Sequence, residues 1–187
     1  MKELSLNVLD ITENSVKAGA DLVNILIREI EDRLEIVIED NGVGMTDDVL
    51  SSVENPFYTT RTTRKVGMGI PLFRLAAEQT GGTFQISSRH IDSFSENHGT
   101  CVHAVFNKHH IDFTPLGDIV STLITLIQGH PDVDFRFIHE NGCATVSLDT
   151  KALREVLEGV PLDTFEVIVW IRDNLTEQYD SFSKNKI

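Results

Sequence analysis

A tight antiparallel hairpin near the N-terminus constrains the fold of this chain most. Residues 33–40 (RLEIVIED) carry an aliphatic side chain at every second position, which is typical of a strand with one buried face. Residues 21–30 (DLVNILIREI) are also expected to form a strand, and only Glu31-Asp32 separates the two. Two linking residues leave no room for a crossover, so the strands must pair antiparallel.

The rest of the N-terminal part alternates between helical and extended patterns. A glycine pair, Gly81-Gly82, is a typical helix stop. The further elements expected here are a helix over 2–18, a mobile polar loop over 46–66, a helix over 70–80, and strands over 83–89 and 100–107.

The composition changes near residues 108–116, which suggests a division into residues 1–110 and an accessory α+β region over 111–187. The role of the accessory region is not predicted. Its expected elements are a helix over 116–128, a hairpin of strands 133–139 and 143–148 around Asn141-Gly142, and helices over 150–158 and 163–177. We expect this region to cover the second face of the sheet.

The charge of the chain excludes some partners. Lys and Arg number 16 and Asp and Glu 29, so the net charge is −13. Nucleic acids and anionic membranes favour basic surfaces, so neither is expected as the main partner. Apolar runs are too short for a membrane-spanning helix, and the N-terminus does not resemble a secretory signal. With only two cysteines, a cytoplasmic protein is expected.

The first candidate site lies on the opening helix. Asp10, Asn14 and Lys17 are spaced four and three residues apart and therefore share one helix face. A carboxamide oxygen suits Mg²⁺, which takes few protein ligands, and a lysine suits phosphate. An ordinary solvated helix face is the alternative.

The second candidate is the segment DNGVGM at residues 40–45, directly after a strand. Asp40 at the strand end can accept a hydrogen bond from an amino group. Gly42 and Gly44 allow the backbone to approach a flat ligand closely. A simple turn is the alternative, because Asp-Asn-Gly is common turn chemistry.

The third candidate lies before the helix expected over 70–80. Gly67 and Gly69 expose amide donors where the helix dipole favours an anion. Arg61, Arg64 and Lys65 make the preceding segment positive in an acidic chain, which points to an anionic ligand such as a triphosphate. A surface loop with scattered charges is the alternative.

In their order and spacing, these three segments together with Gly99-Thr100 resemble the motifs of the GHKL superfamily of ATP-binding domains. That superfamily includes gyrase, the ninety-kilodalton heat-shock chaperone, histidine kinases and MutL-type repair proteins. The segment PFYTTR at 56–61 resembles the phenylalanine-containing box of the histidine-kinase branch. The resemblance implies a Bergerat fold, an α/β two-layer sandwich with a mixed, mostly antiparallel sheet and helices on one face.

The resemblance also implies a role for each matching residue. Asn14 would ligate magnesium, and Asp40 would pair with the adenine amino group. Asp10 takes the place of the catalytic general base, one methylene shorter than the glutamate common in ATP-hydrolysing members. The other implied nucleotide contacts are Lys17, Gly42, Gly44, Met45, Phe57, Thr60, Arg61, Lys65, Gly67, Met68, Gly69 and Thr100.

These roles imply a protein that binds ATP and Mg²⁺. No helical hairpin precedes Asn14, so the expected function is a cytoplasmic, kinase-type signalling or regulatory protein whose phosphoacceptor lies on a partner protein. Two alternatives stay open, a non-catalytic ATP-sensing module and a slow ATPase. A protein kinase is the first expectation for an enzyme and an ATPase the second, and the oligomeric state is not predicted.

Overall fold

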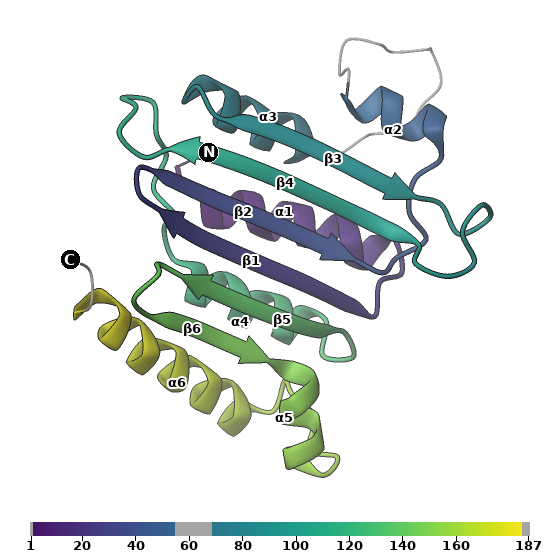
Figure 1. Ribbon diagram of the computed structural model, residues 1–187. Helices are drawn as coiled ribbons and strands as arrows, with labels where there is room; N and C mark the ends of the chain where they lie inside the picture. The colour runs from purple at the N-terminus through teal and green to yellow at the C-terminus, as the bar shows by residue number, and fades with distance from the viewer. Residues whose placement is uncertain (1, 55–68, 185–187) are drawn as a thin grey trace.

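One six-stranded sheet organises the molecule. The computed structural model describes residues 2–54 and 69–184. The strands lie in the order β3-β4-β2-β1-β5-β6 (Figure 1). Their bounds are β1 Leu22–Ile30, β2 Arg33–Asp40, β3 Thr83–Arg89, β4 Gly99–Asn107, β5 Asp134–Glu140 and β6 Thr145–Asp149. The helices are α1 Leu4–Lys17, α2 Asp47–Glu54, α3 Gly69–Gln79, α4 Ile119–Gly129, α5 Thr150–Leu157 and α6 Phe165–Lys184.

The hairpin expected near the N-terminus is confirmed. Strands β1 and β2 pair antiparallel from Val23 opposite Asp40 to Ile30 opposite Arg33. Glu31 in the two-residue link has a φ of +47°, the left-handed conformation that such tight hairpin turns need. The hairpin therefore places the end of β2, where the candidate residue Asp40 lies, beside the start of β1.

The accessory region extends the sheet, and the expectation that it would cover the second face was wrong. Strand β5 pairs in parallel with β1, from Leu22 opposite Asp134 to Arg28 opposite Glu140, and β6 then pairs antiparallel with β5. The other pairings are antiparallel. The edge of β1 that faces away from β2 offers a row of backbone donors and acceptors, and a parallel strand satisfies them.

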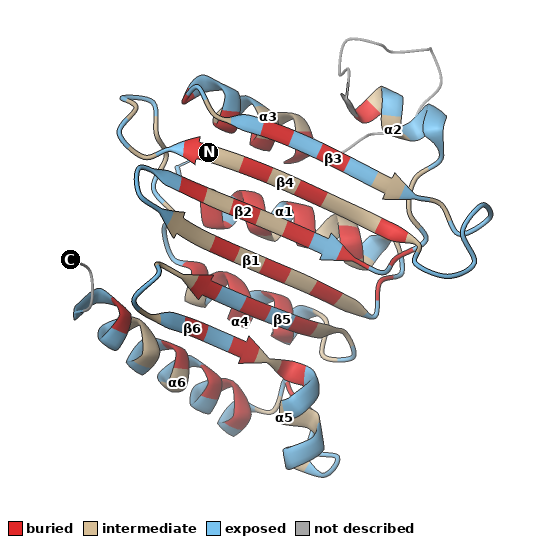
Figure 2. Cartoon of the chain, in the orientation of Figure 1, coloured by how far each residue is buried: buried red, intermediate tan, exposed pale blue. Residues whose placement is uncertain are grey.

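The hydrophobic core lies on one face of the sheet. Helices α1, α3 and α4 lie behind the strands (Figure 1). Buried residues alternate with more exposed ones along the strands (Figure 2). Ile25, Ile36 and Ala104 are buried on the helix side, whereas Arg28 and Glu35 point to the other face. We call this second, polar side of the sheet the open face. An antiparallel sheet tolerates such a solvated face without a cover.

Helix α1 lies between α3 and α4 and contacts both (Figure 1). Leu4, Val8 and Ile11 point into the core, and the backbone amides of Leu4 and Ser5 donate to Pro115 and Leu116. Because apolar residues fix this face of the helix against the sheet, the direction of its polar face is fixed as well.

Helix α2 corrects one expectation. Residues 46–66 were expected to form a polar loop, but Asp47–Glu54 is a helix. Val53 is buried and Leu50 is partly buried against the core, so two side chains on one helix face anchor it. A helix of eight residues is too short for its period to show in the sequence. Residues 55–66 of the expected loop lie outside the described residues.

A buried polar cluster joins α6 to the helix side of the sheet. His139 Nδ1 and Tyr179 Oη are hydrogen-bonded at 2.9 Å. His139 Nε2 lies 3.4 Å from Glu29 Oε1, and Lys108 Nζ lies 3.3 Å from Glu29 Oε2. Burial raises the pKa of Tyr179 and keeps its hydroxyl neutral. These contacts tie the last helix to strands β1 and β5.

None of the helices in residues 2–54 and 69–184 combines the length and the apolar character needed to cross a membrane.

Candidate functional site

The side chain of Asp40 is the centre of the candidate site. It lies at the end of β2, points to the helix side and is only 9% exposed. Its Oδ1 accepts hydrogen bonds from the backbone amides of Gly42 at 2.9 Å and Thr100 at 3.2 Å. Its Oδ2 accepts one from the Ser15 hydroxyl at 2.6 Å. One carboxylate thus holds together α1, the loop after β2 and the start of β4.

The loop after Asp40 passes through a narrow space that only glycine fits. A Cβ on Gly42 would lie 2.9 Å from the carbonyl oxygen of Ala18. Gly44 has a φ of +71°, and a Cβ there would lie 2.1 Å from the carbonyl oxygen of Arg89. Steric crowding therefore explains why both of these positions in the DNGVG segment are glycine.

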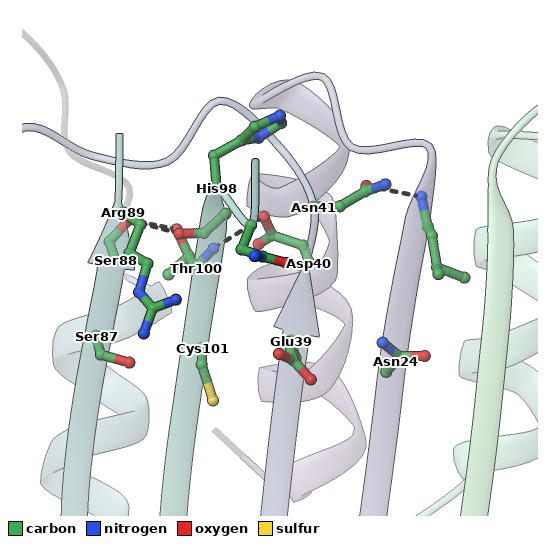
Figure 3. Close-up of a pocket in the computed structure, with 13 residues that line it drawn as sticks. Asn24, Glu39, Asp40, Asn41, Ser87, Ser88, Arg89, His98, Thr100 and Cys101 are labelled. Atoms are coloured by element: carbon green, nitrogen blue, oxygen red, sulfur yellow. Dashed lines mark hydrogen bonds between the residues drawn. The ribbon is translucent and has the colours of Figure 1, made fainter. Parts of the chain in front are cut away.

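Residues at the start of β4 also belong to the candidate site around Asp40. Gly99 has a φ of +133°, and a Cβ there would lie 1.9 Å from the carbonyl oxygen of Asp40. The hydroxyls of Thr100 and Ser88 are 2.9 Å apart, and the Ser88 hydroxyl accepts from the amide of Met45 at 2.7 Å. Figure 3 shows Asp40, Thr100 and Ser88 side by side at these strand ends. The two segments predicted separately, DNGVGM and Gly99-Thr100, are therefore neighbours.

The predicted residues of α1 lie along its polar face. Asp10 is exposed and Asn14 is half-buried. A Cβ on Gly69, the first residue of α3, would lie 3.0 Å from the Cβ and 3.6 Å from Oδ2 of Asp10. Asp10 and Asn14 are four residues apart and share one side of α1, where Gly69 lies beside Asp10. Asp40 contacts α1 through the next residue, Ser15.

Lys17 is engaged by a neighbour on the same helix. Its Nζ lies 3.6 Å from Glu13 Oε2, and Glu13 Oε1 also lies 2.8 Å from His130 Nε2. The hydrogen bond from His130 lowers the pKa of Glu13. The Lys17 side chain is 70% exposed, and such surface pairs contribute little to stability. Lys17 can therefore exchange Glu13 for another anion at small cost.

Six of the predicted contacts cannot be placed. Phe57, Thr60, Arg61, Lys65, Gly67 and Met68 lie outside the described residues. Their roles stay predictions from the resemblance.

The donor chemistry of α1 fits a magnesium ion with few protein ligands. No group of three or more His, Cys, Asp or Glu side chains in residues 2–54 and 69–184 is arranged to hold a metal ion. Magnesium usually keeps several waters and is bound by one or two protein oxygens together with substrate phosphates. The half-buried carboxamide of Asn14, one helical turn from Asp10, agrees with that mode and not with a protein-only metal cage.

Sequence reasoning missed Ser15 and Ser88, which hold the site together. Ser15 follows a predicted residue on α1, and Ser88 lies directly opposite Thr100 in the β3–β4 register. It also missed Asn41, whose Oδ1 accepts from the amides of Asp21 and Leu22 and fixes the start of β1. The Asn-Gly pair pointed to a turn, but only the register shows which backbone groups its side chain satisfies.

Comparisons with known proteins show the family of this chain. The family described as histidine kinase-, DNA gyrase B-, and HSP90-like ATPase matches residues 2–110. Sporulation kinase E of Bacillus subtilis (strain 168) is 30% identical over 106 residues, which are 55% of this chain and 13% of that kinase. Sporulation kinase B of the same organism is 29% identical over 89 residues, which are 46% of this chain and 21% of that kinase. The matched part is therefore a small fraction of these relatives.

Among solved structures, the Aquifex aeolicus MutL ATPase domain complexed with ADP has a TM-score of 0.55 at 17% identity. The match covers 84% of this chain and 70% of that one. At this identity the likeness shows the fold alone. It confirms the predicted α/β sandwich, and the family match confirms the predicted resemblance. More than half of the chain matches the family, so this protein belongs to the histidine kinase-, DNA gyrase B- and HSP90-like ATPases.

Proposed function

We propose that residues 2–110 bind ATP with Mg²⁺, and that the protein is a cytoplasmic, kinase-type signalling or regulatory protein whose phosphoacceptor is on a partner. The proposal rests mainly on the buried carboxylate of Asp40. Family membership supports it, and so does the ADP in the MutL structure.

The hydrogen bonds of Asp40 suit it to an adenine amino group. An ionised carboxylate has about four acceptor positions. Three are used, by Gly42, Thr100 and Ser15. The three donors fix the orientation of the carboxylate, and the remaining position can accept from a ligand without rearrangement. Because Asp40 is buried, a ligand that lacks a donor there would leave an acceptor unsatisfied, which favours adenine.

The phosphate end of the ligand would lie along α1. Asn14 would hold Mg²⁺, which neutralises phosphate charge when bound. Lys17 would leave Glu13 for a phosphate oxygen. Asp10, beside Gly69 at the start of α3, would orient the attacking group.

The kinase role is supported by the relatives, both named sporulation kinases. Phosphoryl transfer depends on positioning and on charge neutralisation more than on covalent help from the protein. A partner could therefore supply the acceptor to the bound ATP.

Slow ATP hydrolysis is the second candidate, and Asp10 is the observation that favours it. The carboxylate is exposed and lies next to Gly69, where it could orient a water molecule. A module that binds ATP without turnover is the remaining alternative.

Calorimetric titration of the full chain with ATP and Mg²⁺ tests the binding. Asp40→Asn should weaken affinity roughly 10- to 100-fold, because a hydrogen bond to a charged group contributes about 1.5–3 kcal/mol. Asp132→Asn, on the exposed turn before β5, should not change it. Circular dichroism checks that both variants fold. Unchanged affinity in a folded Asp40→Asn variant would refute the adenine contact.

Incubation with ATP labelled on the γ-phosphate then separates the activities. Label on a protein from the source cell's extract supports the kinase. Free phosphate that disappears in Asp10→Ala supports the ATPase. Binding with neither product supports the sensing module.

A further inference from the structure

We propose that a pocket on the open face of the sheet binds a free α-amino acid through both of its charged ends. The pocket has a volume of about 520 Å³, which is in the range of small-molecule sites. It lies at the ends of β1, β2, β3 and β4 (Figure 3), and Asn97 and His98, just before β4, also line it.

The charged groups of this pocket face away from the proposed nucleotide contacts. Successive residues of a strand point to opposite faces of a sheet. Asp40 borders the pocket at the end of β2, but its carboxylate points to α1, where it meets Ser15, so Glu39 points to the open face. On β4, Thr100 lies opposite Asp40 and points to the helix side, whereas Cys101 lies opposite Glu39 and points to the open face. The amino-acid proposal therefore does not depend on nucleotide binding.

Two opposite charges at the pocket have no ionic partner within residues 2–54 and 69–184. Glu39 lines the pocket from β2 and Arg89 from β3, and neither forms a salt bridge with any residue that the structure describes. Elsewhere on the open face, Arg28 lies 2.6 Å from Glu140, and Arg136 lies 3.0 Å from Asp149. Glu39 and Arg89 are thus available to an added ligand.

The spacing of these two charges fits a small zwitterion. Strand β4 lies between β2 and β3, so the two backbones are about 10 Å apart. The side chains of Glu39 and Arg89 each cover part of that distance, and an amino acid can fill the rest. Its carboxylate would take the two parallel hydrogen bonds that a guanidinium offers, and its ammonium group would pair with Glu39.

The residues around Glu39 and Arg89 favour the binding of such a ligand. The Arg89 guanidinium lies 5.8 Å from the centre of the Phe94 ring, a stacking contact that restricts its rotation. Asn24 lies directly opposite Glu39 on β1 and adds an amide oxygen for the ammonium group. Ser87 and Asn97 are also polar, which favours an amino acid with a polar side chain.

Cys101 provides a direct measure of occupancy, because its half-buried thiol lines the pocket. The chain has two cysteines, so Cys143→Ser leaves Cys101 as the only thiol. The rate of its alkylation by iodoacetamide can be followed by mass spectrometry in the folded full chain, with each standard amino acid except cysteine, whose own thiol consumes the reagent, added at millimolar concentration. At least one polar amino acid should slow alkylation saturably.

Derivatives and variants then test the charges. The N-acetyl and methyl ester forms of the active amino acid each lack one charge and should protect at least about tenfold less well, since losing one ion pair inside a site costs about 1.4 kcal/mol or more. Glu39→Gln and Arg89→Gln should weaken protection by the same factor. Arg33→Gln and Glu96→Gln change exposed charges outside the pocket, and protection should persist in both. Nucleotide is absent throughout, so failure of nucleotide binding would not affect the result.

The proposal is overturned if no amino acid slows alkylation. It is also overturned if the N-acetyl form protects as well as the free amino acid, or if both Gln variants at Glu39 and Arg89 remain fully protected. Circular dichroism of each variant ensures that a loss of protection reports on the site and not on folding.

Discussion

The Ser15 hydroxyl donates a 2.6 Å hydrogen bond to Asp40 Oδ2 and so links α1 to the end of β2. Both residues are buried, Ser15 with 4% and Asp40 with 9% of its surface exposed. A buried carboxylate must be satisfied by donors from the protein. The link therefore fixes the orientation of the one carboxylate on which the proposed adenine contact depends.

Replacing Ser15 by alanine should lower the free energy of unfolding by about 1–3 kcal/mol, because a hydrogen bond to a charged group is lost inside the protein. Urea denaturation measures the effect. Ser93→Ala, in the exposed loop between β3 and β4, is the matched control and should stay within about 0.5 kcal/mol of the wild type. If Ser15→Ala has the same free energy of unfolding as the wild type, the Ser15–Asp40 hydrogen bond makes no net contribution to stability.

Gly99 should tolerate no side chain. Alanine there combines a φ of +133° with a Cβ only 1.9 Å from the Asp40 carbonyl oxygen, so the start of β4 must move. We expect a loss of about 3 kcal/mol or more, since backbone strain and overpacking each cost about 1–3 kcal/mol. Gly129→Ala is the control, because no atom lies within 4 Å of the place its methyl group would take and its φ is not positive. Comparable melting temperatures for the two variants would contradict this account.

The cap of α4 should make stability depend on pH. The Asp118 carboxylate accepts from the amide of Ser121 at 2.8 Å and from its hydroxyl at 2.6 Å, and these bonds lower the pKa of Asp118 below its ordinary value of 3.8. The charged carboxylate therefore stabilises the fold fully above pH 3.8, and this stabilisation is lost as the pH falls through the lower pKa of the folded state.

Two substitutions at Asp118 separate the stability that comes from the capping hydrogen bonds from the stability that comes from the negative charge. Asp118→Ala should lose about 0.5–2 kcal/mol at neutral pH. Asp118→Asn keeps a capping oxygen and should lose only the charge contribution, about 0.3–1 kcal/mol. Urea denaturation at neutral pH and again below the ordinary pKa of an aspartate checks both values. The difference between the wild type and Asp118→Asn should shrink at the lower pH, and a growing difference would refute the assignment.

The side chain of Gln178 satisfies backbone groups at the outer edge of the sheet, in the middle of β6. Gln178 on α6 accepts from the Ser147 amide at 2.8 Å and donates to the Ser147 carbonyl at 3.1 Å. Gln178→Ala should lower stability by about 1 kcal/mol and promote self-association, because strand β6 then presents free backbone groups. Light scattering after gel filtration measures the association. Gln128→Ala, exposed on α4, should remain unchanged in both respects.

Apart from the short helix α2, the sequence predicts the helices and strands of this fold well, because each of them has a local cause. Aliphatic residues at every second position of 33–40 and a two-residue link are enough for the β1–β2 hairpin. The parallel pairing of β1 with β5 could not be predicted in this way. It joins residues more than a hundred positions apart, and the alternation within β5 suits any sheet edge.

The candidate site likewise contains residues that the sequence predicts and residues that only the structure reveals. Asp40, Gly42 and Gly44 stand out because their order and spacing relative to the other candidate segments resemble a known family. Ser15 and Ser88 carry no such signal, since serine occurs in every kind of environment. Their importance comes from the packing and register that set them against Asp40 and Thr100, which is a property of the folded chain.

The position of β1 inside the sheet has a consequence for dissecting this protein. The family match ends at residue 110, but β1 pairs with β2 on one side and with β5, well beyond that boundary, on the other. A fragment cut there would expose the backbone of a nine-residue strand to pairing with its own copies. We therefore expect the matched segment to depend on its neighbour for solubility, and a gene trimmed to residues 2–110 should give aggregates.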